Sequence, residues 1–197
     1  SGVDKAIFSF YKSWYVHDHE QDPGLIQYAV DNGFLAGRYD IDTDVWNPQE
    51  IPSHLVHIRT DAYPEDVVVT QDGGMQKNWT RYLSGRPVDG YTVCSSAFWN
   101  YGAPRIGNDL TRNNYNTRFF DTILSLALLE CYSENHPLTR FEDMINKKTY
   151  LETVSDKFNL IIGTEDVRDY AVSKLHYNEG VLTIVVSQDA AYSWLDP

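Results

Sequence analysis

The spacing of apolar residues predicts helices in the first quarter of the chain. Between residues 7 and 15, apolar side chains recur every three or four positions, which makes one apolar helical face. Asp22-Pro23 predicts the start of a second helix, with an acidic cap and a proline in the first turn, and Asn32-Gly33 predicts its end. Residues 37–53 are rich in Asp, Asn and Pro and indicate a long loop.

The central part of the chain mixes short β patterns with stronger helical ones. Short strands are predicted at Leu55–Arg59 and Tyr91–Cys94, and Val67–Thr70 indicates a strand or the end of a short helix. Phe119–Cys131 has the apolar pattern of a helix. Thr139 followed by Glu142 has the spacing of a capping box, so a further helix is expected to begin there.

The end of the chain predicts β structure. A strand at Phe158–Ile162 precedes Thr164-Glu165-Asp166, which indicates the start of a short helix. Residues 172–177 and 181–186 predict a hairpin. Helices first, scattered strands and a final hairpin favour one α+β domain over residues 1–197, with a split mixed or antiparallel sheet and a helical segment, 1–50, packed on it.

The amino-acid composition limits the kinds of partner that the protein is expected to bind. With 28 acidic against 16 basic residues, the formal net charge is -12, which repels nucleic acid and anionic lipid and favours a basic protein partner. No apolar run is long enough to span a membrane. Abundant Asn, Asp, Tyr and Trp with little Lys favours a secreted or periplasmic protein. Cys94 and Cys131 would form one disulfide in a secreted protein, or be two buried thiols in a cytosolic one.

Residues 56–75, VHIRTDAYPEDVVVTQDGGM, have the residue order of an enzyme site. The order resembles the opening of the cholera- and pertussis-type ADP-ribosylating toxins, in which a strand arginine is followed by a proline-acidic turn. The stretch NWTRYLSGR at 78–86 and the strand ending in Ser95-Ser96 resemble later motifs of that family. The resemblance implies an ADP-ribosyltransferase-like fold and NAD as the substrate of a protein-modifying transferase.

The resemblance also implies roles for individual residues. Arg59, with Asp61 beside it, would hold the diphosphate of NAD, because a guanidinium donates in parallel to phosphate oxygens. Ser95 and Ser96 would shape the cleft. The catalytic carboxylate would be Glu152, with Glu134 as the alternative, stabilising positive charge on the ribose.

Two alternatives remain open at this point. A non-catalytic acidic module, such as an immunity or effector-binding protein, fits the negative charge and the aromatic surplus. The aromatic helix and the final hairpin also resemble the cone of nuclear-transport-factor-like proteins. No metal site is predicted, because His17 and His19 face apart on a helix and lack a third ligand.

Overall fold

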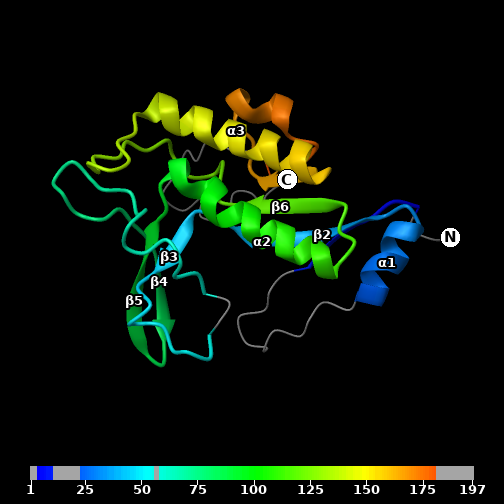
Figure 1. Cartoon of the computed structure of the whole chain (residues 1–197), viewed down its shortest axis with the longest axis horizontal. Coiled ribbons are helices and arrows are strands. Elements are labelled where there is room, and N and C mark those ends of the chain that lie inside the picture. Colours follow the sequence, from blue (N-terminus) through cyan, green and yellow to red (C-terminus); the bar gives the residue numbers. More distant parts are fainter. Residues whose placement is uncertain (1–3, 11–22, 56–57, 181–197) are drawn as a thin grey trace, which may run out of the picture.

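A computed structural model describes residues 4–10, 23–55 and 58–180 (Figure 1). In chain order the elements are β1 (Ile7–Phe10), α1 (Pro23–Asp31), β2 (Leu35–Ile41), β3 (Asp44–Trp46), β4 (Lys77–Leu83), β5 (Arg86–Thr92), the 3₁₀ helix η1 (Ser95–Ala97), α2 (Phe98–Arg112), β6 (Thr117–Asp121), α3 (Arg140–Phe158), β7 (Ile161–Glu165), the 3₁₀ helix η2 (Asp169–Lys174) and β8 (Tyr177–Glu179).

The main sheet has five strands in the order β1-β2-β6-β7-β8, and every neighbouring pair is parallel. A helix, α1, α2, α3 or η2, lies in each connection between successive strands of this sheet. Strands that follow one another in space as in sequence, each joined by a helix, are the repeating unit of a (β/α) barrel. The described strands therefore form an open part of such a barrel.

A second, smaller sheet interrupts this repeat. The antiparallel strands β3, β5 and β4 lie in the connection from β2 to α2 and extend to one end of the molecule, opposite α1 (Figure 1). The connection leaves the main sheet at the carboxyl end of β2, so the insertion stands beside that edge of the barrel sheet.

Local sequence signals define the ends of the helices. The Thr139 hydroxyl accepts a hydrogen bond from the Glu142 backbone N–H at 3.3 Å, and the Glu142 carboxylate accepts one from the Thr139 N–H at 2.8 Å. This capping box begins α3, as the sequence predicts, and Asn159 in the left-handed conformation ends it. The helix predicted after Asp22-Pro23 is also confirmed as α1, and Gly33 at φ 79° follows its end.

The two faces of the main sheet have different neighbours. Phe120 of β6 points to the helices, since its ring lies 5.5 Å from that of Tyr150 in α3. Phe119 points to the inner face, where it stacks on Tyr39 at 5.1 Å and approaches Tyr177 at 6.2 Å. Alternation along β6 therefore places Asp121 on the same inner face as Phe119.

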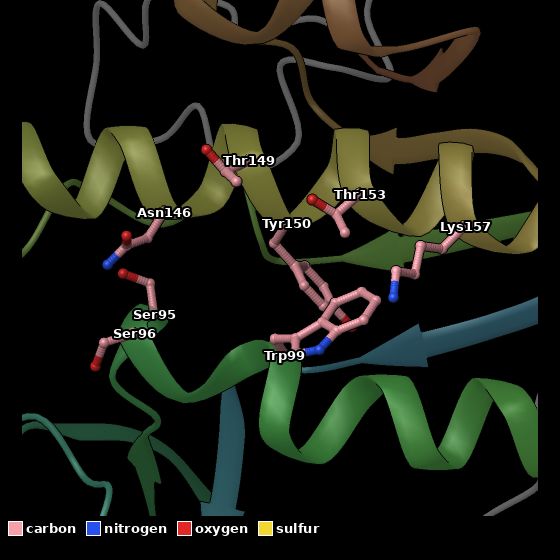
Figure 2. A pocket seen from close by; sticks show the side chains of 8 residues that line it. All are labelled: Ser95, Ser96, Trp99, Asn146, Thr149, Tyr150, Thr153 and Lys157. Atoms are coloured by element: carbon pink, nitrogen blue, oxygen red, sulfur yellow. The ribbon is translucent and has the colours of Figure 1, made fainter.

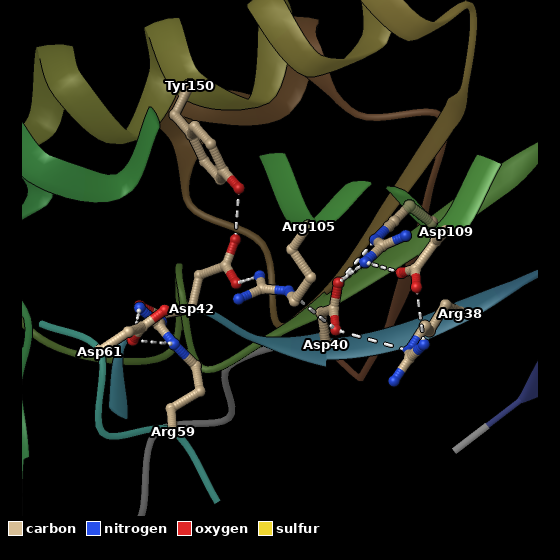
Figure 3. A network of polar contacts seen from close by, with 9 residues as sticks. Arg38, Asp40, Asp42, Arg59, Asp61, Arg105, Asp109 and Tyr150 are labelled. Atoms are coloured by element: carbon tan, nitrogen blue, oxygen red, sulfur yellow. Dashed lines mark hydrogen bonds and ion pairs between the residues drawn. The ribbon is translucent and has the colours of Figure 1, made fainter. Parts of the chain in front are cut away.

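An ionic network lies between α2 and the sheet, where apolar packing is the norm (Figure 3). Arg118, fully buried, donates to Asp40 on β2 at 2.6 Å and to Asp109 on α2 at 2.8 Å. Arg38 also donates to Asp109, at 2.9 Å. Burial raises the pKa of Asp40, but the charges of Arg118, Arg105 and Arg38 outweigh it and hold that pKa well below its usual range. The network therefore joins α2 to the sheet through buried ion pairs.

The structure corrects the predicted α+β fold, both in its ADP-ribosyltransferase-like form and as a nuclear-transport-factor-like cone. The sheet is parallel and alternates with helices, and β8 pairs in parallel with β7 rather than opening a hairpin. The first hairpin segment begins inside η2, and residues 181–186 lie outside the described part of the chain.

Several single elements are also corrected. Within the predicted helical segment 1–50, the structure has strands β1, β2 and β3, and the last two occupy much of the predicted loop 37–53; residues 11–22 lie outside the described part. The helix predicted at Phe119–Cys131 is the end of β6 followed by a loop, because Phe119 and Phe120 are buried on opposite faces of the strand, and Ile123 and Leu124 are buried in the turn after it. Thr164-Glu165 ends β7 instead of beginning a helix.

None of the helices in the described residues is long and apolar enough to cross a membrane.

We predict that Arg118→Met lowers the free energy of unfolding by about 3–5 kcal/mol, because it leaves buried Asp40 and Asp109 without their shared cation. Urea denaturation measures the change. The control is Arg140→Met, whose exposed guanidinium lies 3.7 Å from Glu130 and whose loss should cost less than about 1 kcal/mol. Equal, small effects of both substitutions would contradict a structural role for the network.

Candidate active site

Two carboxylates end adjacent parallel strands. Asp121 is the last residue of β6 and Glu165 the last of β7, and the pair before them, Phe120 and Thr164, are partners in the register. Parallel strands present their carboxyl ends at one edge of the sheet, so the two side chains emerge next to each other. In barrels of this type, that edge carries the catalytic residues.

Both side chains lie on the inner face of the sheet. Glu165 follows Gly163 by two positions, and Gly163 faces the Tyr177 ring so closely that a Cβ there would come within 2.2 Å of it. Tyr177 belongs to the same inner layer as Phe119. Phe119 and Gly163 each precede a carboxylate by two positions, so the aromatic layer lies next to the carboxylates on the inner face and packs against the strands that carry them.

Asp121 and Glu165 interact directly. A side-chain hydrogen bond with Asp121, followed by burial and the Asp121 charge, raises the pKa of Glu165 to about 7. The Ser125 hydroxyl donates to Glu165 Oε2 at 3.2 Å and opposes this rise. With this pKa, Glu165 is about half protonated at neutral pH beside a second carboxyl group, which suits a residue that acts as an acid and then as a base.

The backbone turns sharply after each carboxylate. Thr122 has φ 61° and Asp166 has φ 54°, a left-handed conformation that non-glycine residues rarely adopt. The Thr122 hydroxyl is hydrogen-bonded to that of Thr43, which follows β2 at the same edge. Strained residues of this kind concentrate at functional sites, where the surrounding structure holds them.

A buried aspartate supports the neighbouring end of β2. The Asp42 carboxylate is hydrogen-bonded to Arg105 of α2 and to the Tyr150 hydroxyl of α3 (Figure 3). Its burial is nearly complete, with 2% of the residue exposed, so substrate has no access to it. Asp42 therefore joins the two helices to the active-site edge and serves as a positioning residue.

The residues that the sequence analysis selects lie in several places. Arg59 donates to Asp61 at 3.0 Å and to the Asp42 carbonyl at 2.7 Å, and it is therefore held at the edge of the site by protein groups. Glu152 lies on α3 in an ion pair with Lys174. Glu134 is exposed in the loop before α3. The structure does not bring these residues together.

Ser95 and Ser96 instead line a cavity of about 330 Å³ between η1, the start of α2 and α3 (Figure 2). The other lining residues are Trp99, Asn146, Thr149, Tyr150, Thr153 and Lys157. All belong to the helical layer, so this cavity lies on the opposite side of the sheet from Asp121 and Glu165. Neither Arg59 nor Glu152 lines it.

The sequence analysis missed Asp121 and Glu165, although a signal for each exists. TRFFD and IIGTE are short apolar runs that end in an acid, 44 positions apart (165 minus 121), with one helix between them. That is the pattern of consecutive βα units with acids at the carboxyl ends. Because helices are predicted for residues 119–131 and 164–166, the carboxyl ends of β6 and β7 are not recognised from the sequence.

The fold has solved counterparts. The chain is similar to the α-N-acetylgalactosaminidase NagBb from Bifidobacterium bifidum in its GalNAc complex, with a TM-score of 0.65 and 18% identity over 79% of this chain and 23% of that one. The ligand-free structure of the same enzyme gives 0.64 and 18% over 79% of this chain and 24% of that one. At this identity the likeness shows the fold alone.

Other comparisons add less. An α-galactosidase from Thermus thermophilus overlaps at a TM-score of 0.49 and 14% identity, covering 80% of this chain and 32% of that one, too loosely to carry weight. No curated protein sequence matches significantly. The chain spans about a quarter of the length of the NagBb structures.

The family comparison overturns the predicted transferase. The profile of glycosyl hydrolases related to the GH101 family, GH129, matches residues 10–195. The resemblance to ADP-ribosylating toxins, and the transferase activity implied by it, is therefore wrong for this chain, and the acidic binding module has no support either. The match spans nearly the whole chain, which thus belongs to the glycosyl hydrolases of family GH129.

Proposed function

We propose that this chain supplies the catalytic carboxylates of a retaining glycoside hydrolase, with Asp121 as the nucleophile and Glu165 as the acid and base. The observation that carries the proposal is the hydrogen-bonded pair at the ends of β6 and β7, in which Glu165 has a pKa of about 7. Two carboxyl groups this close together leave no room for the water molecule that attacks the sugar in an inverting enzyme. In a retaining enzyme, the nucleophilic carboxylate itself must approach the anomeric carbon closely.

The first step uses both members of the pair. With a sugar between them, protonated Glu165 gives its proton to the glycosidic oxygen while the Asp121 carboxylate attacks the anomeric carbon. The bond to the leaving group breaks as the Asp121–sugar ester forms, so the leaving alcohol departs neutral.

The second step follows from the cause of the pKa shift. Once Asp121 is an ester it is uncharged, and of the causes that raise the Glu165 pKa only burial remains, so that pKa falls. Glu165 is then an anion at neutral pH and takes a proton from the incoming water, whose oxygen attacks the anomeric carbon and releases Asp121. One pair thus supplies an acid and then a base without any change in external pH.

The substrate class proposed for the full-length protein is a terminal α-linked N-acetylgalactosamine. Its support is the family assignment together with the similarity of the fold to an α-N-acetylgalactosaminidase. The main sheet of five described strands provides the carboxylates, and closing a barrel around the sugar requires further strands.

In the full-length protein, we expect Asp121→Asn and Glu165→Gln each to lower kcat/KM for a Ser/Thr-linked α-N-acetylgalactosaminyl peptide by at least about 100-fold. Glu152→Gln is the matched control, because it neutralises a carboxylate on α3 that lies outside the site. It should retain wild-type activity. Loss of activity in Glu152→Gln alone would refute the assignment.

A nitrophenyl glycoside separates the two roles. Nitrophenolate leaves without protonation, so Glu165→Gln should cleave its first bond at a rate near wild type, while Asp121→Asn should remain inactive. NMR of the first sugar released by the wild type should show the α-anomer. Release of the β-anomer would contradict a covalent intermediate.

The proton shared by the pair is directly measurable. We predict that Glu165 titrates near pH 7 in carbon-detected NMR, and that Asp121→Asn moves its pKa toward the ordinary value for glutamate. Because the folded state holds this proton to higher pH than the unfolded state, Glu165 makes stability fall as pH rises from about 4.3 to about 7. Glu165→Gln should flatten that part of the urea-midpoint profile, and an unchanged profile would argue against the raised pKa.

A further inference from the structure

Two cysteines and a histidine from distant parts of the chain meet beside the smaller sheet. The Sγ atoms of Cys94 and Cys131 and a ring nitrogen of His136 all lie within 4.8 Å of one another. Cys94 follows β5, whereas Cys131 and His136 belong to the loop between β6 and α3. Both cysteines are buried and neither is in a disulfide.

The histidine is oriented as a ligand. Its Nε2 lies 2.9 Å from the carbonyl oxygen of Glu65, which can only accept, so Nε2 carries the proton. In the neutral ring Nδ1 is then an acceptor, and it lies 3.3 Å from Cys131 Sγ. A backbone carbonyl that fixes the tautomer from behind is the usual partner of a metal-bound imidazole.

Hydrogen bonds hold the two sulfurs in place. The N–H of Cys131 donates to the Leu138 carbonyl at 2.8 Å and the Leu138 N–H donates back at 3.0 Å, closing a short loop around His136. The Val69 N–H donates to Cys131 Sγ at 3.3 Å, and the Ser96 hydroxyl donates to Cys94 Sγ at 3.1 Å. Donors aimed at sulfur stabilise thiolates, the form that binds metal.

We propose that Cys94, Cys131 and His136 bind one zinc ion that acts as a structural clip. Tetrahedral zinc holds two sulfurs at about 2.3 Å and a nitrogen at about 2.0 Å, which requires only a small contraction of the present cluster. Two thiolates with one imidazole favour zinc over calcium or magnesium. Ser96, whose hydroxyl donates to Cys94 Sγ, is exposed beside the cluster. Binding releases the two thiol protons to solvent.

Two other uses of these residues fit less well. A nucleophilic cysteine needs access to its substrate, but Cys94 is fully buried. A Cys94–Cys131 disulfide would leave the Nδ1 of half-buried His136 with no donor, whereas zinc satisfies all three atoms.

The position of the proposed zinc ion connects it with the active site. The loop that carries Cys131 and His136 begins directly after Asp121, and its Ser125 contacts Glu165. Zinc would fix the far end of this loop to residues next to β5. The inference does not depend on the proposed hydrolase chemistry, because the ion touches neither Asp121 nor Glu165.

The test titrates cobalt chloride, and then zinc chloride, into chelator-treated, reduced full-length protein without a histidine tag. One Co²⁺ per chain should give the thiolate charge-transfer band and the ligand-field bands of a tetrahedral site, and zinc should abolish them while raising the Tm. His136→Ala and Cys131→Ser should lose stoichiometric binding. His54→Ala, an exposed histidine outside the cluster, should keep it.

The wild-type spectrum decides the matter even if a cysteine variant does not fold. Absence of the cobalt bands in reduced protein that is folded by circular dichroism would overturn the proposal. Recovery of a Cys94–Cys131 disulfide from protein isolated without reductant would overturn it as well. A site that fails these tests while Asp121→Asn still abolishes hydrolysis would leave the proposed function standing.

Discussion

Hydrogen bonding between β6 and β7 determines where the chemistry of this protein can occur. The parallel register pairs Phe120 with Thr164 and so brings the next residues, Asp121 and Glu165, to one edge and one face of the sheet. Sliding one strand by a single residue would turn one carboxylate toward the helices and separate the pair. The raised pKa of Glu165, and with it the proposed acid and base roles, depends on this register.

The layer behind the sheet explains how the register is held. Arg118 precedes Asp121 by three positions on β6 and is fixed between β2 and α2 by two buried carboxylates. Asp42, at the end of β2, binds both α2 and α3. Buried ion pairs add little net stability compared with apolar packing, but they have demanding geometry. Here they would suit positioning, since a shifted strand leaves charges unpaired.

The sequence predicts some of this structure and hides the rest, for physical reasons. The capping box at Thr139 and the proline start of α1 are local signals, and both helices form. The strands β6 and β7 are buried on both faces, so they lack the alternating pattern of a half-exposed strand and resemble helix segments. Asp121 and Glu165 become a site only through pairing between strands, which no local motif records. Arg59 and Asp61, which lie in a motif-like residue order, form an ion pair with each other in the structure.

The most direct test of the account is to trap the covalent intermediate. Full-length Glu165→Gln, mixed with a dinitrophenyl α-N-acetylgalactosaminide, should form the ester quickly and hydrolyse it slowly, because the base of the second step is missing. Peptide mass spectrometry should then find one N-acetylhexosamine on the peptide that contains Asp121. A sugar attached to another carboxylate, or complete turnover with no adduct at any time, would contradict the assignment of Asp121 and Glu165.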